Sequence, residues 1–276
     1  GLVYADYITT VSDTYACEIQ NDYYGEGLDG LLRARNNSLC GIINGIDYSI
    51  YNPQTDNEIF RQYGPDDFTM GKARNKEELQ RELGLPVDKN KFMIAIISRL
   101  TDQKGLDLVN WVLDKILDDN TQLVVLGTGE QRYENTFRHY QGIQPNKVSA
   151  NIFFSENRAH KIYAAADAML VPSRFEPCGL TQLISLKYGT VPIVRETGGL
   201  KDTVQPYNEF DGTGTGFSFA NYNGDEMLGA INYSKNVYYD HRKEWDKMVK
   251  RCMKTDFSWN SSARQYEGMY DWMINW

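Results

Sequence analysis

The sequence predicts an α/β protein built on a doubly wound parallel sheet, and three observations lead to this class. First, residues 92–97 form a continuous apolar run, which is typical of a strand covered on both faces. Second, residues 106–117 place their apolar side chains at helical spacing on one face. Third, such runs and such amphipathic stretches alternate between residues 92 and 194. Strands that alternate with helices favour right-handed crossovers and a parallel sheet with helices on both faces.

Before this repeat, the sequence predicts short and isolated elements. The β-branched residues 7–11 indicate a strand, and Ser12 is expected to cap a helix that begins near Asp13. Residues 23–30 are rich in Gly and Asp and are predicted to form a loop. A second short strand is expected at residues 39–43.

The repeat itself is predicted as five strands with helices between them. The strands are expected at residues 92–97, 122–126, 151–154, 168–171 and 191–194. The helices are expected at residues 76–83, 106–117, 130–140, 159–166 and 180–188. A short strand at 216–219 and helices at 226–235, 242–252 and 261–274 complete the prediction. The last helix is expected to bury one face formed by Tyr266, Met269, Tyr270 and Met273.

Composition restricts the classes of function. The chain has 276 residues, is 41% hydrophobic and carries a formal net charge of -8. No clustered basic face is visible, so we expect no nucleic-acid partner and no binding to anionic membranes. No apolar run reaches the length of a membrane span. Four cysteines without zinc-site spacing indicate reduced thiols in a cytosol-like compartment.

Polar and glycine-rich loops follow the predicted strands. In an open parallel sheet, ligands bind beyond the carboxyl ends of the strands, so these loops are expected to meet at one edge. The residues concerned are 98–105, Gly127 and Thr128, then Arg174, Glu176, Cys178 and Gly179, and finally 196–200. Their glycines, hydroxyls and charges predict a nucleotide-like ligand that carries phosphates.

Arg99 and Lys104 are the candidate phosphate ligands, because each brings a positive charge to a loop that ends in glycine. The alternative is a solvated surface pair. Gly198 and Gly199 would let backbone amides approach a phosphate closely, although an ordinary tight turn needs the same residues. Gly127 is not followed by the spacing of a dinucleotide fingerprint or a P-loop, which weakens NAD-binding and ATPase hypotheses.

Glu176 lies in the turn just ahead of a predicted helix, whose first amides are unpaired. It is therefore either a carboxylate that stabilises the helix dipole or a working carboxylate. His139, His160 and His241 are scattered, and we expect structural or surface roles for them. His160, at a helix start, would at most act through a neighbouring residue. The sequence shows no metal-site pattern and no Ser-His-Asp order, and glycoside hydrolysis normally needs two facing carboxylates.

Several strings of residues resemble the bacterial glycogen synthase and plant starch synthase family. The longest is Ser-Arg-Phe-Glu-Pro-Cys-Gly-Leu-Thr-Gln at residues 173–182, within the matching stretch 172–189. The other matches are Ala5-Asp6 and Thr-Thr-Val-Ser at 9–12, Gly-Ile-Ile-Asn-Gly-Ile-Asp at 41–47, residues 98–105, Thr-Gly-Gly-Leu-Lys-Asp-Thr-Val at 197–204 and Asp-Phe-Ser-Trp at 256–259. The resemblance spans essentially the whole chain.

The resemblance implies a GT-B glycosyltransferase, which has two Rossmann-like domains and an active site in the cleft between them. This chain would be the C-terminal domain, which binds the nucleotide-sugar donor. The reaction would transfer glucose from ADP-glucose to the non-reducing end of an α-1,4-glucan, with retention of configuration and without a metal or other cofactor. Two alternatives stay open: a related transferase that uses UDP-glucose, and a non-catalytic nucleotide- or glucan-binding module.

The family's site residues map onto this sequence by resemblance. Arg99 and Lys104 would hold the donor diphosphate, and Glu176 would bond the donor glucose near the reacting centre. Asn44 would reach the cleft from the hinge, and Phe154 would stack on adenine. Further phosphate and sugar contacts are expected from Gly127, Thr128, Cys178, Gly179, Leu180, Thr181, Thr197, Gly198, Gly199 and Leu200.

Two departures from the family pattern matter. Many related retaining transferases carry a second Glu eight positions after the first, where this chain has Ile184, as this subgroup usually does. The N-terminal half of the family, with its Lys-x-Gly-Gly-Leu loop, has no counterpart here.

The resemblance also implies a division into domains. Residues 1–50 would be the tail of that acceptor domain plus the hinge, 51–255 the donor domain, and 256–276 a helix that crosses back. We therefore expect an inactive fragment of a bacterial cytoplasmic enzyme, a plastid being the other possible location.

Overall fold

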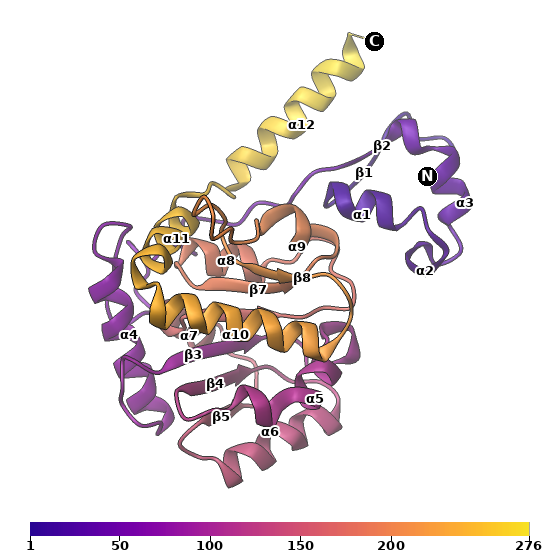
Figure 1. Cartoon of the computed structure of the whole chain (residues 1–276). Coiled ribbons are helices and arrows are strands. Elements are labelled where there is room, and N and C mark those ends of the chain that lie inside the picture. Colours follow the sequence, from indigo (N-terminus) through magenta and orange to yellow (C-terminus); the bar gives the residue numbers. More distant parts are fainter. Residues whose placement is uncertain (276) are drawn as a thin grey trace.

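The computed structural model describes residues 1–275, and its centre is a six-stranded parallel sheet (Figure 1). The strand order is β5-β4-β3-β6-β7-β8, so the chain returns to the middle of the sheet between β5 and β6. The strands are β3 (Phe92–Ile97), β4 (Thr121–Leu126), β5 (Val148–Asn151), β6 (Ala168–Val171), β7 (Val191–Arg195) and β8 (Phe217–Phe219). The switch point between β3 and β6 is where an open sheet of this kind binds ligands.

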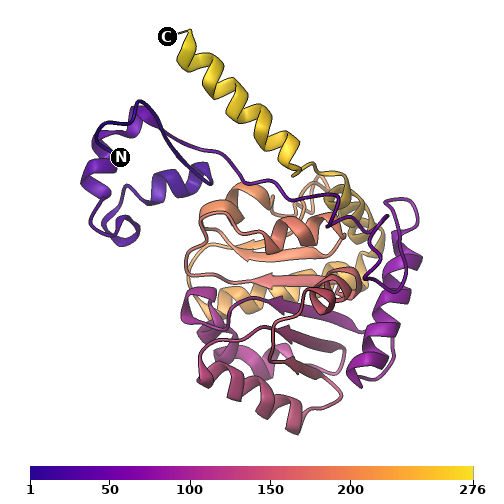
Figure 2. The ribbon, with the colours of Figure 1, turned by 180° about the vertical axis from the view of Figure 1, so that it is seen from behind.

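Helices cover both faces of the sheet. α10 packs beside α5, and α4 packs beside α7. α10 lies in front of the strands in Figure 1 and behind them in Figure 2. The helical elements of this body are α4 (Phe68–Leu83), η2 (Asp102–Lys104), α5 (Leu106–Ile116), α6 (Gln131–Ile143), α7 (Glu156–Ala165), α8 (Thr181–Lys187), α9 (Gly198–Thr203), α10 (Gly224–Asp240) and α11 (Arg242–Lys254).

The apolar runs form the core, as the sequence predicts. Phe92, Met93 and Ile94 of β3 are fully buried, and so are Leu106 and Leu113 on the inner face of α5. The predicted bounds of β3 and β6 are those observed. The fold class is therefore confirmed: a parallel α/β sheet with helices on both faces.

Two elements of the body, β5 and α4, begin or end well away from the predicted bounds, and α10 extends further than predicted at both ends. β5 ends at Asn151, whereas the sequence suggested a strand at 151–154. The aromatic residues Phe153 and Phe154 gave a strand signal, yet both are exposed in the loop that follows. α4 begins at Phe68 rather than at residue 76. The first turns of this helix, which the sequence analysis missed, pack closely against Tyr63, because a Cβ on Gly71 would lie 2.2 Å from Tyr63 Cβ.

The N-terminal segment, residues 1–43, lies beside this body (Figures 1 and 2). Its parallel strands are β1 (Ile8–Thr10) and β2 (Leu39–Gly41), and its helices are α1 (Asp13–Glu18), α2 (Asp22–Gly25), α3 (Asp29–Ala34) and η1 (Asn36–Ser38). Ser12 Oγ accepts a hydrogen bond from Tyr15 N at 2.9 Å, which confirms the predicted cap. The predicted loop at residues 23–30 is wrong in part, because α2 and the start of α3 fall there.

The C-terminal helix α12 (Trp259–Ile274) extends away from the body (Figure 1). The predicted burial of one apolar face is wrong. Tyr270 is 55% exposed, and of the described helix residues only Ser262 is buried. The helical spacing of the apolar side chains is real, but α12 has little of this chain to pack against. Residue 276, the end of the predicted C-terminal element, lies outside the described residues.

Two segments far apart in sequence run side by side where α12 leaves the body. Ile46 and Ser258 form a parallel bridge, and Ile46 N donates to Phe257 O at 2.8 Å. Ser262 Oγ donates to Ile43 O at 2.7 Å. A Cβ on Gly45 would lie 2.3 Å from Trp259 N, so a glycine is needed for this close approach. Over residues 1–275, no helix combines the length and apolarity that a membrane span requires.

Candidate active site

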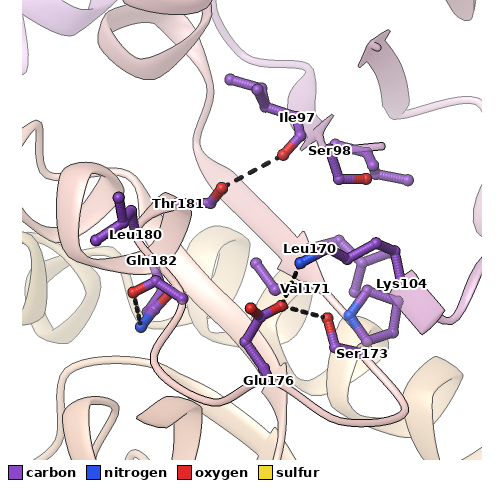
Figure 3. A pocket seen from close by; sticks show the side chains of 13 residues that line it. Ile97, Ser98, Lys104, Leu170, Val171, Ser173, Glu176, Leu180, Thr181 and Gln182 are labelled. Carbon is purple, nitrogen blue, oxygen red and sulfur yellow. Dashed lines mark hydrogen bonds and ion pairs between the residues drawn. The ribbon is translucent and has the colours of Figure 1, made fainter. Parts of the chain in front are cut away.

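A carboxylate and an ammonium group meet at the carboxyl ends of β3 and β6 (Figure 3). Lys104 Nζ lies 2.5 Å from Glu176 Oε2, and Ser173 Oγ donates to the same oxygen at 3.0 Å. The Glu176 side chain is only 10% exposed, and that of Lys104 only 19%. Both side chains line a small cavity at the switch point of the sheet. The structure thus brings together the two residues that the sequence placed on separate loops.

Close backbone contacts explain why these loops meet. Gly105 follows Lys104 with φ +72°, and a Cβ there would lie 2.0 Å from Pro172 O. Only glycine tolerates both that backbone conformation and that contact. The loop after β3 therefore packs directly on the end of β6, and this contact carries the Lys104 ammonium to Glu176.

The two glycines that begin α9 make a second close contact. A Cβ on Gly198 would lie 2.1 Å from Glu176 O, and a Cβ on Gly199 would lie 2.2 Å from Cys178 O. Gly199 N donates to Glu176 O at 3.0 Å. These glycines therefore support the turn that carries Glu176, a role that the sequence analysis did not foresee.

A carboxylate of the N-terminal segment lies against the same turn. Glu18 Oε1 accepts hydrogen bonds from Thr197 Oγ1 at 2.8 Å and from Gly198 N at 3.0 Å. A donor phosphate at the Gly198 amide would require Glu18 to move, so that contact stays a prediction. Leu200 is fully buried in the core, and its side chain does not reach the cavity.

Arg99 lies on the other side of the same loop. Its exposed side chain donates from Nη2 to Gln103 Oε1 at 2.9 Å. Arg99 lines a neighbouring cavity of about 320 Å³, whereas Lys104 lines the cavity of Glu176. Ile97 and Ser98 line both cavities, which shows that the two adjoin.

The neighbouring cavity, called here the aromatic cavity, combines rings with a positive charge. Its lining includes Arg99, Gly127, Thr128, Tyr51, Phe153, Phe154 and Tyr163. A flat apolar ring system beside a guanidinium group suits a nucleobase whose phosphates point toward the basic loop. The sequence analysis expected Phe154 here but missed Tyr51 and Phe153, which carry no signal beyond being aromatic.

The residues that follow Glu176 also approach the cavity. Gly179, Leu180 and Thr181 line it, and Thr181 Oγ1 donates to Ile97 O at 3.4 Å. Cys178 is buried, and burial raises the pKa of its thiol, while a hydrogen bond with the Asn44 backbone acts in the opposite direction. The protonated thiol is a poor nucleophile.

Gln182, which the sequence analysis did not single out, shapes this turn. Its Nε2 donates to Cys178 O and Gly179 O, both at 2.8 Å, and to Thr203 Oγ1 at 3.2 Å. The side chain therefore connects the turn after Glu176 with α9. No group of three or more His, Cys, Asp or Glu residues in the described chain could hold a metal ion.

A basic loop and a buried carboxylate at the switch point of a parallel sheet are typical of an α/β domain that binds a ligand at this edge. Residues 75–251 match the family model for glycosyl transferases group 1, and the chain belongs to that family. Residues 1–34 match the model for the starch synthase catalytic domain.

Individual relatives agree with this family. The chain is 65% identical to the glycogen synthase of Lachnospira eligens and 59% identical to that of Lachnoclostridium phytofermentans, in each case over 271 residues. Each match covers 98% of this chain and 57% of the relative, so the chain spans little more than half the length of these relatives.

One solved structure is similar over the whole chain. It is the catalytic domain of starch synthase IV from Arabidopsis thaliana bound to ADP and acarbose, with a TM-score of 0.92 and 33% sequence identity. The match covers 100% of this chain and 57% of that one. The fold is thus that of the Rossmann-like C-terminal domain of GT-B glycosyltransferases, as the resemblance implied.

Proposed function

We propose that this chain is the donor-binding part of a glycogen synthase, which transfers glucose from ADP-glucose to the non-reducing end of an α-1,4-glucan with retention of configuration. The observation that carries the proposal is the Lys104–Glu176 pair in a cavity that adjoins the aromatic cavity. The names of the glycogen synthase relatives, and the ADP in the starch synthase structure, support this choice of reaction and nucleotide.

Each part of the donor then has a counterpart. The base would lie in the aromatic cavity, the diphosphate along the loop between Arg99 and Lys104, and the glucose beside Glu176. When the glycosidic bond to the phosphate breaks, the departing phosphate gains negative charge. Lys104 and Arg99 are positive charges that are already in place, and such preorganised groups lower the barrier of this step.

The Lys104–Glu176 contact is compatible with a bound donor. An ammonium group has three N–H donors, so Lys104 can keep its bond to Glu176 while it binds a phosphate oxygen. Ser173 holds the same carboxylate oxygen. The other oxygen, Oε1, would then accept a hydrogen bond from a glucose hydroxyl. Ile184, where many related transferases have a second Glu, is buried and apolar, so that position supplies no carboxylate.

The acceptor glucan would bind partly to the portion of the protein that this chain does not span. We infer that residues 1–50 belong to a second domain and its hinge, and that α12 crosses back onto that domain. The match of residues 1–34 to one family model and of residues 75–251 to another supports this division. This chain alone is then inactive in transfer. Because the relatives are bacterial proteins, we favour a bacterial cytoplasmic enzyme over a plastid enzyme.

Calorimetric titration of this chain with ADP, UDP and ADP-glucose tests the proposal. We expect ADP and ADP-glucose to bind, UDP to bind more weakly, and Arg99→Ala and Lys104→Ala each to weaken ADP binding at least tenfold. Lys115→Ala is the matched control, because this lysine is exposed on α5. Failure of ADP to bind, or equal binding by the two site variants and the wild type, would refute the assignment.

The alternative of a non-catalytic binding module needs a different measurement. In the protein completed to the length of its relatives, Glu176→Gln should abolish most glucose transfer while ADP still binds. If the variant transferred glucose as fast as the wild type, Glu176 would not act at the reacting centre. If the completed wild type showed no transfer, the binding-module alternative would be favoured.

A further inference from the structure

The exposed and half-buried rings of the aromatic cavity come from segments that are far apart in sequence. Phe153 and Phe154 come from the loop between β5 and α7, whereas Tyr51 comes from the linker that joins the N-terminal segment to the sheet. Phe154 is 85% exposed, while Tyr51 is half-buried. Tyr51 is thus the better fixed of these two rings, and it lies outside every motif that the sequence analysis used.

Tyr51 is fixed by a buried histidine. The Tyr51 and His160 rings are stacked, with centroids 5.0 Å apart and an angle of 20° between their planes. His160 lies on α7 and is buried. Stacked aromatic pairs contribute stability beyond their buried area, so the Tyr51 ring cannot turn away from the cavity without losing this contact.

His160 is in turn held by a buried hydrogen-bond network. Its Nδ1 lies 2.7 Å from Asp56 Oδ2, and Tyr188 OH donates to the same oxygen at 2.5 Å. Glu58 N donates to Asp56 Oδ1 at 2.8 Å. Buried networks whose members all have partners are rigid, so the linker, α7 and the end of α8 hold His160 in one orientation.

We propose that Tyr51 is a binding residue that stacks on the nucleobase of the donor, and that His160 is a positioning residue that acts through Tyr51. This inference rests on the proposed function, because it assumes that the aromatic cavity holds a base. It assigns part of the base affinity to Tyr51, a linker residue that none of the sequence motifs covers. Stacking between a base and an aromatic side chain typically corresponds to about a tenfold change in affinity on substitution.

The test compares a ligand that has a base with one that has none. ADP and inorganic pyrophosphate are titrated into the wild type, Tyr51→Leu and Tyr51→Ala, with Tyr4→Leu as the control, since Tyr4 is 91% exposed. We expect Tyr51→Ala to weaken ADP about tenfold and pyrophosphate less than twofold. Tyr51→Leu keeps an apolar side chain against His160, so this variant is expected to stay folded. A further variant, Tyr51→Phe, keeps the ring and should bind ADP more tightly than Tyr51→Leu.

A double-mutant cycle tests the role of His160. If His160 acts through Tyr51, His160→Gln weakens ADP several-fold in the wild-type background but causes no further loss in Tyr51→Leu. Additive losses would overturn the positioning role. Equal losses for ADP and pyrophosphate, or unchanged ADP binding in Tyr51→Leu, would overturn the base contact. A wild type that binds neither ligand would instead refute the proposed function itself.

Discussion

Two buried lysine–carboxylate pairs lie at opposite ends of β6. At the carboxyl end, Lys104 Nζ is 2.5 Å from Glu176 Oε2. At the amino end, Lys76 Nζ is 2.5 Å from Asp167 Oδ2, directly before the strand begins. The two pairs have the same chemistry and the same spacing, but only one of them lies among the residues that we assign to the donor.

The difference lies in what else each lysine touches. Lys76 Nζ also donates to Lys89 O, Lys91 O and Tyr238 OH, at 2.9 to 3.2 Å, so the protein uses its donors fully. Within residues 1–275, Lys104 Nζ has a hydrogen bond to Glu176 alone. Since an ammonium group has three donors, Lys104 has donors to spare for a ligand. The remaining hydrogen-bonding capacity, together with the greater exposure of Lys104, separates the site cation from the structural one.

The largest effect is expected at the structural pair. Lys76→Met would leave Asp167 charged, buried and without its cation, which should lower the free energy of unfolding by about 3–5 kcal/mol. Urea denaturation measures this. Combining Lys76→Met with Asp167→Asn should recover part of the loss, because the uncompensated charge is gone. A cost below about 1 kcal/mol for Lys76→Met would mean that the two pairs do not differ as described.

Lys72, one helical turn before Lys76, makes the free energy of unfolding depend on pH. Burial lowers the pKa of Lys72 to about 7, although its Nζ donates to Thr190 Oγ1 at 2.8 Å. Above this pH the folded chain has lost a proton that the unfolded chain keeps up to its ordinary pKa. The free energy of unfolding should therefore rise between pH 7 and 9, by up to about 1.4 kcal/mol per pH unit.

Urea midpoints at several pH values between 7 and 9 would show this slope, and Lys72→Met should flatten it. The exposed Lys115→Met is the matched control, and it should leave the slope unchanged. A slope that persists in Lys72→Met would assign the proton to another group.

A smaller effect on stability is expected at the site pair. Lys104→Met leaves Glu176 with its hydrogen bond from Ser173 and with access to the cavity. The cost in unfolding free energy should be about 1 kcal/mol, well below that of Lys76→Met, because the Lys104 side chain is 19% exposed against 3% for Lys76, and an ion pair that water reaches contributes less to stability. The same urea measurement compares the two variants directly. Similar costs would contradict the distinction between the pairs.

The smallest effect concerns Ser173. Ser173→Ala removes one hydrogen bond to Glu176 without changing the charge of the site. We expect ADP-glucose to bind about threefold more weakly relative to ADP, roughly 0.7 kcal/mol, because Glu176 would lose part of its orientation toward the glucose. Parallel titrations with both ligands give this ratio. An unchanged ratio would separate Ser173 from glucose binding.

The sequence was sufficient to predict the body of the fold and the meeting of the loops that carry Lys104 and Glu176. Continuous apolar runs such as Phe92–Ile97 have one stable placement, in a sheet covered on both faces. Because parallel strands end at one edge, the loops that follow them must meet there. That topological rule brings Lys104 to Glu176 without any knowledge of side-chain packing.

The sequence was not sufficient where the buried side chains are polar. The inner face of α4 includes the buried Lys72, Asn75, Lys76 and Gln80, so hydrophobic periodicity shows only the second half of that helix. The contact between Tyr51 and His160 was missed for a related reason. Their stacking joins the linker to α7, and a contact between residues 109 positions apart leaves no periodic signal.

The side-by-side passage of Ile46 and Ser258 has a mechanical consequence. A single connecting segment allows rotation about any axis. Two segments that are hydrogen-bonded to each other resist twisting and restrict the motion to rotation about one hinge axis. The N-terminal segment and α12 would then rotate together as one rigid body, and this rotation would carry Asn44, which lies next to the hinge, toward or away from Cys178.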